Sequence, residues 1–306
     1  MNEIKIFCPA TIANISCGFD VLGVALDSVG DEMIVRKTKQ KGIRITKLEG
    51  QHLPKETHLN VAGVAGLALL AVSDYNGGFD IEINKKIKAG SGIGSSAASS
   101  AGAVWAMNQL LGTPFSTLDL VKFAMEGERL ASGVAHADNV APALYGGFTL
   151  IRSYSPLDVI PIPSPAELYA TVIHPQIEVK TSDSRKILKT TISLADGIKQ
   201  WGNLGGLIAG LFTSDYDLIG RSLEDHIVEP IRSILIPGFD AVKSAAIANG
   251  ALGCGISGSG PSIFSFSKGE TTAHKVGSAM KDVYEKIGID FDVHISKINT
   301  DGIKQI

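Results

Sequence analysis

Apolar and polar residues alternate in several short stretches of the first half of the chain, and longer stretches there carry apolar residues at helical spacing. Alternation predicts half-buried strands, whereas apolar residues that recur every three or four positions predict helices with one buried face. The pattern predicts strands over 4–7, 32–37, 43–47, 79–84 and 145–152, and helices over 59–72, 96–111 and 116–130. Such a mixture of strands and helices predicts an α+β arrangement of layers.

Two details of this half are also predicted. The stretches 32–37 and 43–47 follow each other closely and alternate in the same way, so we expect them to form an antiparallel pair. Pro9 is expected to end the first strand, because proline has no N–H group to donate to a neighbouring strand.

A proline-rich segment over 155–165 separates this half from a second set of elements. Its composition is typical of a linker, so we expect two domains, 1–155 and 156–306. The second domain is predicted to contain strands over 168–174, 263–266 and 291–298, a short helix from Thr181, and further helices over 194–212, 215–223, 238–249 and 272–287. This order of elements suggests a small split βαβ sandwich.

Composition restricts the class of protein. The chain has 306 residues, of which 44% are hydrophobic and 19% charged, as in ordinary globular proteins, and a formal net charge of -3 argues against a nucleic-acid surface. The longest apolar stretch, 61–72, is too short to cross a membrane, and the first residues do not have the pattern of a signal peptide. Cys8, Cys17 and Cys254 are scattered and lack metal-ligand spacing, which indicates a reduced, cytoplasmic protein.

The run GSGIGSSAA over 90–98 is the most informative motif. Alternate glycines let a loop take positive φ and direct several N–H groups at one anion, and Ser95 and Ser96 are suited to cap the helix that follows. A helix N-terminus favours negative charge, so the run predicts a phosphate site. It lacks the lysine of a Walker A loop and the third glycine of a dinucleotide fingerprint. A flexible turn is the alternative, but the preceding strand and following helix favour phosphate.

Polar residues gather in three other segments. A glycine-bounded loop over 8–23 contains Asn14 and Asp20, and Glu128 near the end of a predicted helix is a carboxylate of the kind that Mg²⁺ prefers. The segment that follows contains His136, Asp138 and Asn139, and a second glycine loop, GISGSGPS, covers 255–262. The alternatives here are local hydrogen bonding, a solvated glutamate and tight turns.

Three of these segments together resemble the GHMP kinases, a family of small-molecule kinases that includes galactokinase and mevalonate kinase. The run over 90–98 resembles their phosphate motif, and that over 255–262 resembles their C-terminal glycine motif. The stretch PATIANISCGFDVLGVAL over 9–26 is similar to the N-terminal signature of the branch that phosphorylates L-homoserine. The resemblance covers essentially the whole chain.

The resemblance implies a fold and an activity. The implied fold is the two-domain α+β GHMP kinase fold, with a left-handed βαβ crossover in the N-terminal domain, a ferredoxin-like C-terminal domain and the active site between them. The implied reaction is Mg²⁺-dependent transfer of the γ-phosphoryl group of ATP to the side-chain hydroxyl of L-homoserine, on the route to threonine, by a cytoplasmic homodimer. The alternatives are another small-molecule kinase of the family, or a non-catalytic member that binds a nucleotide or metabolite.

The same resemblance implies roles for individual residues, carried over by position. Those implied for the substrate are Asn14, Asp20, His136, Asn139, Arg185 and Arg232, with both arginines on its carboxylate. Those implied for Mg²⁺ are Ser96 and Glu128. Those implied for ATP are Lys88, Ala89, Gly90, Ser91, Gly92, Ile93, Gly94, Ser95, Ser96, Ala97, Ala98, Thr181, Ser257, Gly258, Ser259 and Gly260.

Asn139, Asp20 and Glu128 are the implied catalytic residues. Asn139 stands where other family members are thought to have a base aspartate, and because an amide cannot accept the proton, we expect it to orient the hydroxyl. Asp138 and Asp20 remain candidate bases. Lys88 replaces the proline that is usual at the start of the phosphate motif, so we expect a change in loop stiffness or a cation near the phosphates.

Overall fold

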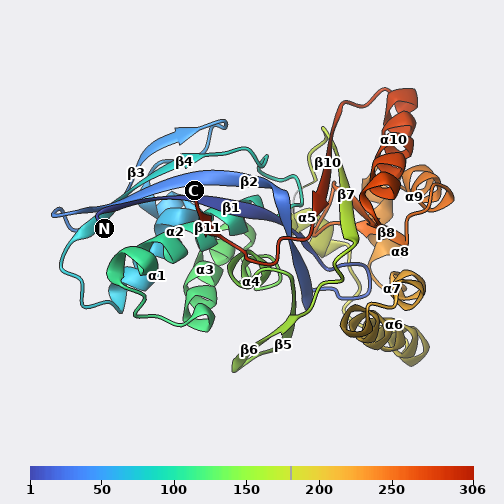
Figure 1. The fold of residues 1–306 in the computed structure, drawn as a ribbon, viewed down its shortest axis with the longest axis horizontal. Coiled ribbons are helices and arrows are strands. Elements are labelled where there is room, and N and C mark those ends of the chain that lie inside the picture. The colour runs from blue at the N-terminus through green and yellow to red at the C-terminus, as the bar shows by residue number, and fades with distance from the viewer. Residues whose placement is uncertain (180) are drawn as a thin grey trace.

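The computed structural model describes residues 1–179 and 181–306, and the side chains of Thr181 and Ser182 lie outside this description. Within these residues, two β-sheets of seven and four strands organise the chain, each with helices packed against it (Figure 1). The predicted α+β arrangement is therefore confirmed. No helix in the described part of the chain is both long and apolar enough to cross a membrane.

The first sheet has the order β11-β1-β2-β4-β3, and β5 extends from the start of β2 and pairs with β6. Its strands are β1 (Glu3–Ala13), β2 (Leu22–Thr38), β3 (Gly42–Glu49), β4 (Gly78–Asn84), β5 (Phe148–Tyr154), β6 (Leu157–Ile162) and β11 (Lys304–Gln305). The expected antiparallel pairing of 32–37 with 43–47 is wrong, because β4 lies between β2 and β3 and runs parallel to β3. The helix between β3 and β4 carries the chain back to the same end of the sheet, which permits parallel pairing.

Pro9 does not end the first strand, contrary to the prediction. β1 continues to Ala13, and its register against β2 shifts between Pro9 and Thr11. A bulge leaves a residue out of the ladder, so a proline without an N–H group is tolerated there. The longer strand carries the chain directly to the turn that begins at Asn14.

Helices cover one face of the first sheet. They are η1 (Thr57–Leu59), α1 (Val61–Ala71), α2 (Ser95–Leu111), α3 (Thr117–Ser132) and α4 (Val140–Tyr145), and Figure 1 shows α1, α2 and α3 beneath the long strands. α2 is buried along most of its length, and its alanines, serines and Gly102 let it pack closely against β1. The N-cap of α2 is Gly94 in a left-handed conformation, so the expected capping by Ser95 and Ser96 is wrong.

The second sheet has the order β10-β7-β9-β8, and all its neighbouring strands are antiparallel. Its strands are β7 (Leu168–Pro175), β8 (Gly253–Ile256), β9 (Ile263–Lys268) and β10 (Phe291–Lys297). The helices of this part are α5 (Thr181–Lys186), α6 (Leu194–Thr213), α7 (Tyr216–Ser222), α8 (Glu229–Arg232), η2 (Ser233–Leu235), α9 (Phe239–Ala248) and α10 (Glu270–Ile287). α9 and α10 pack together, with α10 against β7, β9 and β10 and α9 against β8, which gives this sheet its own core.

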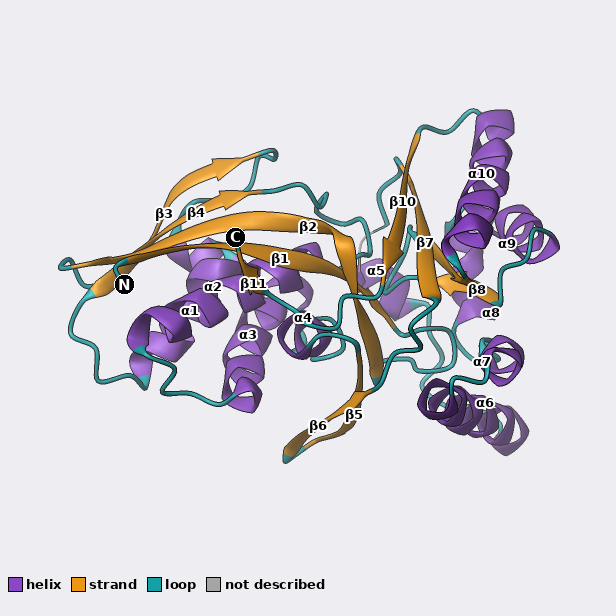
Figure 2. Ribbon diagram, in the orientation of Figure 1, coloured by secondary structure: helices purple, strands orange, loops and turns teal. Residues whose placement is uncertain are grey.

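The expected domain boundary at 155 and 156 falls inside the hairpin of β5 and β6, and the second sheet begins only at Leu168. Most of the proline-rich segment, which predicts a linker, therefore forms β6, the outer strand of this hairpin. We propose that the boundary lies at 163–167, and β11 then returns the end of the chain to the first sheet. Figure 2 shows that loops fill much of the region between the two sheets, and the candidate site lies there.

Candidate active site

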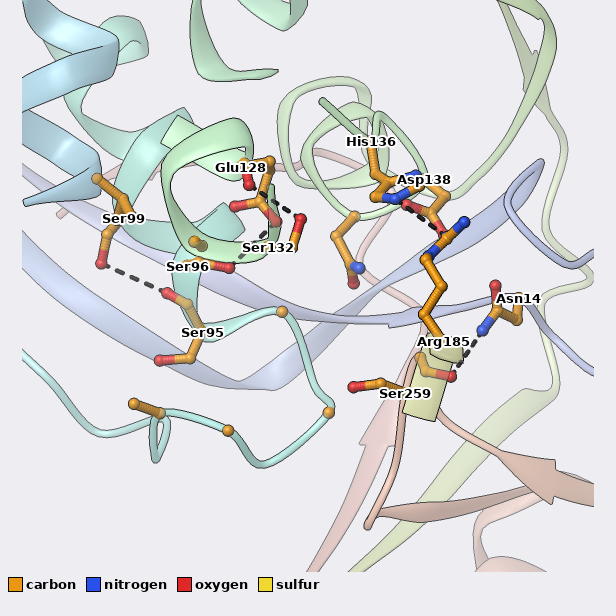
Figure 3. A pocket seen from close by; sticks show the side chains of 18 of the residues that line it. Asn14, Ser95, Ser96, Ser99, Glu128, Ser132, His136, Asp138, Arg185 and Ser259 are labelled. Carbon is orange, nitrogen blue, oxygen red and sulfur yellow. Dashed lines mark hydrogen bonds between the residues drawn. The ribbon is translucent and has the colours of Figure 1, made fainter. Parts of the chain in front are cut away.

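A cavity of about 350 Å³ lies between the two domains, where loops from both meet (Figure 3). Of the predicted residues, fifteen line it: Asn14, Asp20, Ala89, Gly90, Gly92, Gly94, Ser95, Ser96, Glu128, His136, Asn139, Arg185, Arg232, Gly258 and Ser259. Asp138 lines it too. Lys88, Ser91, Ile93, Ala97, Ala98, Ser257 and Gly260 are not part of the lining, and the predicted role of the Thr181 side chain lies outside the described residues.

The first glycine loop is held against both domains. Gly92 and Gly94 have φ angles of 84° and 71°, and a Cβ atom on Gly94 would lie 2.0 Å from Thr11 Oγ1. A Cβ atom on Gly92 would lie 2.6 Å from the carbonyl oxygen of Gly260, in the second glycine loop. Only glycine fits at these two points, because both the backbone angle and the close neighbours exclude a side chain.

The predicted residues outside the lining support this loop from behind. The hydroxyl of Ser257 donates to the carbonyl of Gly92 at 2.7 Å, and the N–H group of Ser262 donates to the carbonyl of Ser91 at 3.3 Å. The carbonyl of Ile93 accepts from the N–H group of Thr11 at 3.2 Å. The second glycine loop therefore fixes the shape of the first.

The start of α2 supplies the donors of an anion site. Its first helical hydrogen bond runs from the N–H group of Ala98 to the carbonyl of Gly94, so the N–H groups of Ser95, Ser96 and Ala97 have no acceptor within the helix. Ser95 and Ser96 line the cavity at this point. Unpaired N–H groups together with the helix dipole favour a phosphate group.

Glu128 faces the start of α2 and carries an unsatisfied oxygen. The hydroxyl of Ser96 donates to its Oε2 at 3.1 Å, as Figure 3 shows, whereas its buried Oε1 has no hydrogen-bond partner among the described residues. Burial raises the pKa of the Glu128 carboxyl to about 7, against smaller lowering effects of the Ser96 hydrogen bond and the Lys85 charge. A carboxylate with a free oxygen beside a hydroxyl suits a hard cation such as Mg²⁺, which usually takes only one or two carboxylates from a protein.

Lys88 does not bring a cation to this end of the cavity. Its Nζ donates to Oε1 of Gln176 at 2.6 Å, just beyond the end of β7. The structure therefore does not place the Lys88 cation near the proposed phosphate site, although this was one of the two expectations for this residue. The contact joins the first glycine loop to the second domain instead.

The middle of the cavity holds a fixed amide and a buried acid. The hydroxyl of Thr11 donates to Oδ1 of Asn139 at 2.7 Å, which leaves the amide nitrogen of Asn139 to donate elsewhere. Asp138 is buried, and burial raises its pKa to about 7, with added effects of the Asp20 and Glu128 charges. A carboxyl with a pKa near neutrality can take up or release a proton under ordinary conditions.

An ion pair occupies part of the other end. Nη2 of Arg185 donates to both carboxylate oxygens of Asp20 at 2.8 Å and lies 3.0 Å from Nε2 of His136. Burial is the main cause that lowers the pKa of His136, so its ring is mostly neutral at pH 7. Asp20 is thus engaged with an arginine.

Arg232 is a buried cation at the same end. It is 3% exposed, and among the described residues it donates only to backbone carbonyls, those of Ser184 at 3.1 Å and Gly258 at 3.2 Å. No acidic group lies within 4.0 Å of it among the described residues, and burial followed by the charge of Arg185 lowers its pKa to about 10. A buried charge that lacks an opposite charge favours binding of an anion.

Asn14 holds the turn at the edge of the cavity. Its side-chain nitrogen donates to the carbonyl of Gly258 at 2.7 Å, and its Oδ1 accepts from the N–H group of Asp20 at 2.9 Å. Asn14, Ile15, Ser16 and Asp20 all have positive φ, an uncommon backbone conformation for residues other than glycine. Such strain clusters at functional sites, where surrounding contacts maintain it.

Among the residues at the site that were not predicted, three have contacts that shape it or its arginines. Thr11 orients Asn139, and Phe19 lines the cavity beside the arginines. Nζ of buried Lys85 contacts Asp31 and donates to the Ser95 carbonyl at 2.8 Å, which anchors the start of α2. Thr11 and Phe19 lie inside the recognised segment 9–26, but Lys85 follows an ordinary strand and no pattern distinguishes it.

Family models agree with this combination of fold and site. The model of the GHMP kinases N terminal domain matches residues 60–147, and that of the GHMP kinases C terminal domain matches residues 207–286. The chain belongs to the GHMP kinase family, and the predicted two-domain fold of that family is confirmed.

Within this family the chain is similar to homoserine kinases. It is 47% identical to the homoserine kinase of Chlorobium phaeobacteroides strain BS1, with 100% of both chains covered, and 38% identical to that of Pyrococcus abyssi, with 96% of both covered. The crystal structure of homoserine kinase from Cytophaga hutchinsonii has a TM-score of 0.96 and 55% identity, and covers 100% of this chain and 98% of that one. The L. major mevalonate kinase shares the fold at a TM-score of 0.72 and 15% identity, over 96% of each chain.

Proposed function

We propose that this chain transfers the γ-phosphoryl group of ATP to the side-chain hydroxyl of L-homoserine, which yields O-phospho-L-homoserine and ADP. The full-length similarity to homoserine kinases supports this activity. One observation of the structure carries it. A single cavity joins a helix start suited to phosphate to a carboxylate oxygen and a buried arginine, and neither has a partner of its own among the described residues: the oxygen lacks a hydrogen bond and the arginine lacks an acid.

The phosphate end of the cavity is suited to ATP with Mg²⁺. The N–H groups at the start of α2 would bind phosphate oxygens, and Glu128 with Ser96 would hold the metal ion. A bound Mg²⁺ would neutralise part of the phosphate charge that Glu128 would otherwise repel. Because burial raises the pKa of Glu128 to about 7, metal binding favours the deprotonated form and competes with a proton.

The arginine end is suited to an amino-acid carboxylate. Guanidinium groups form paired charge-assisted hydrogen bonds with carboxylates, and Arg232 pairs with no acid in the part of the chain that the structure describes. The guanidinium group of Arg185 would bind the substrate carboxylate while it also pairs with the carboxylate of Asp20. His136 and Asp20 then provide a neutral ring and a carboxylate near the α-ammonium group.

Asn139 and Asp138 would act on the substrate hydroxyl. The Thr11 hydroxyl fixes the amide oxygen of Asn139, so its NH₂ group is left to position the hydroxyl in line with the phosphate. Asp20 is paired with Arg185, which leaves Asp138, with its pKa near 7, as the better acceptor for the proton. Phosphoryl transfer has a loose transition state, so positioning and electrostatics provide most of the acceleration and a strong base is not needed.

Two further expectations belong to this proposal. A homodimer in the cytoplasm follows from the family resemblance, and light scattering on the purified chain tests the assembly. A mass of one chain across a wide range of protein concentrations would rule out the dimer. The role implied for Thr181 at the ATP γ-phosphate stays a prediction.

A coupled assay for ADP release tests the function. The chain is incubated with Mg-ATP and, in matched reactions, with L-homoserine, L-serine, mevalonate or shikimate. We expect a strong response to L-homoserine, because it offers an α-carboxylate to the arginines and a terminal hydroxyl one carbon further away than that of L-serine. If every acceptor fails while ATP binds, a nucleotide-binding role without catalysis replaces the proposal.

A further inference from the structure

Phe19 is the one aromatic ring that meets both arginines of the cavity within the described residues. The Cζ atoms of Arg185 and Arg232 lie over its ring, at 5.4 and 5.0 Å from the ring centre. The ring is half-buried and lines the cavity between the domains. Cation–π contacts occur within about 6 Å, so both guanidinium groups are in range of the same ring.

The two guanidinium groups beside the Phe19 ring carry like charges. The charges of Arg185 and Arg232 repel each other, and Arg185 is one cause of the lowered pKa of Arg232. A carboxylate between them would relieve the repulsion, but it would compete with the carboxylate of a substrate. An aromatic ring presents a negative face without a formal charge, so it adds no carboxylate beyond Asp20, which already pairs with Arg185, and it leaves the charge of Arg232 for a ligand.

The surroundings of Phe19 fit a role in positioning better than one in core packing. Phe19 also lines a second cavity, of about 630 Å³. Its neighbour Asp20 pairs with Arg185, and the strained turn that contains both is held by Asn14. The turn thus brings a ring and a carboxylate to the arginines, while close packing does not surround the ring.

We infer that Phe19 is a positioning residue for the carboxylate subsite, whose ring holds the guanidinium groups of Arg185 and Arg232 together so that both bind the substrate. This inference rests on the proposed function, because the carboxylate is that of L-homoserine. Phe19 touches neither reacting atom. Its effect passes through the arginines to the affinity for the amino acid.

Kinetics of Phe19 variants with two acceptor substrates test the inference, first with L-homoserine. The variants Phe19→Leu and Phe19→Tyr are compared with Phe291→Leu. Phe291 is a half-buried ring of the second sheet that packs against Tyr284 in a tilted arrangement and contacts no cation in the described part of the chain. Phe19→Leu is expected to raise KM for L-homoserine by about tenfold, while Phe19→Tyr and the control stay within about twofold. KM for ATP is expected to stay within about twofold in all three variants.

The second substrate is 3-amino-1-propanol, which is L-homoserine without its carboxylate. If Phe19 acts through the arginines, Phe19→Leu lowers kcat/KM for L-homoserine by about tenfold but that for 3-amino-1-propanol by less than about twofold. An equal loss with both substrates would mean that the substitution distorts the site in general, and would overturn the inference. Activity of the wild-type chain toward neither substrate would overturn the proposed function together with the inference.

Fluorinated phenylalanines at position 19 separate electrostatics from shape. One, two and three fluorine atoms withdraw increasing electron density from the ring face and change its size little, so each step weakens the cation–π contact. We expect KM for L-homoserine to rise stepwise along the series at constant KM for ATP. A flat series would show that only the volume of the ring matters, and the inference would fall while the proposed function stood.

Discussion

Replacement of Arg232 is the sharpest perturbation of the proposed substrate site. In the change to leucine, the cavity loses a cation that is 3% exposed and has no acid within 4.0 Å among the described residues. Within the described residues, its hydrogen bonds reach only the carbonyls of Ser184 and Gly258. Substrate binding should therefore suffer more than the local structure does.

The magnitude follows from the bonds that the guanidinium offers to a carboxylate. One charge-assisted hydrogen bond contributes about 1.5–3 kcal/mol, and about 1.4 kcal/mol corresponds to a factor of ten. Loss of even one such bond should raise KM for L-homoserine by at least about tenfold. The proposed ATP site lies at the other end of the cavity, so KM for ATP should change by less than about twofold.

The coupled ADP assay measures both constants. Arg232→Lys keeps the charge without the planar fork and should lie between leucine and the wild type. Arg221→Leu removes an exposed arginine from the last turn of α7 and serves as the matched control. Thermal melting of each variant shows whether the fold persists. An unchanged KM for L-homoserine in a folded Arg232→Leu variant would refute the assignment of this residue to the carboxylate.

Four other predictions concern the phosphate end and the hydroxyl. Glu128→Gln should raise the Mg²⁺ concentration for half-maximal rate by at least about tenfold. Burial raises the pKa of Glu128 above its unfolded value, so its contribution to stability is complete below about pH 4.5 and is lost as the pH rises through about 7. Between these pH values, the melting temperature of ligand-free Glu128→Gln should therefore fall less than that of the ligand-free wild type. Gly92→Ala should abolish most activity and Gly90→Ala much less, since both have positive φ but only Gly92 faces a backbone oxygen at 2.6 Å. Thr11→Val should lower kcat by about tenfold at unchanged KM for ATP, because Asn139 loses the bond that orients its amide.

Each of these variants has its own control and its own contrary result. Glu126→Gln, on the exposed face of the same helix as Glu128, should leave the Mg²⁺ dependence unchanged, and an equal shift in both variants would remove Glu128 from the metal site. Equal losses in the two glycine variants would mean that strain alone matters. Thr11→Ser keeps the hydroxyl, so a loss as large as that of Thr11→Val would argue against the role given to this bond.

Local features of the sequence predicted much of the fold. The helix α2 and the loop before it were predicted because alanine, serine and glycine have strong and distinct backbone preferences. The predicted helix 116–130 corresponds to α3, whose N-cap Ser116 bonds the N–H group of Asp119. Propensity and capping act over a few residues, so they can be recognised in a single sequence.

Features that depend on distant contacts were missed. The parallel pairing of β3 with β4 and the bulge at Pro9 depend on which strands become neighbours, and alternation within one strand does not contain that information. The ion pair of Asp20 with Arg185 joins residues 165 positions apart. The contact of Phe19 with both arginines likewise exists only after the two domains meet.

The candidate site was predicted mainly through the family resemblance. Spacing alone gave a phosphate site and left the roles of Asn14, Glu128 and Asn139 open. The structure brings the three to one cavity, but shows that the amide of Asn14 is engaged by the Gly258 carbonyl and the Asp20 N–H group. Hydrogen bonding of this kind depends on side-chain geometry, which a sequence pattern does not supply.

Identification of the product by mass spectrometry tests the central claim most directly. The chain is incubated with L-homoserine, Mg²⁺ and ATP labelled with heavy oxygen in its γ-phosphoryl group. The proposed function predicts O-phospho-L-homoserine that carries the labelled phosphoryl group, formed in equal amount to ADP. Labelled inorganic phosphate with ADP and unmodified L-homoserine would show ATP hydrolysis without transfer, and would contradict the proposed kinase activity.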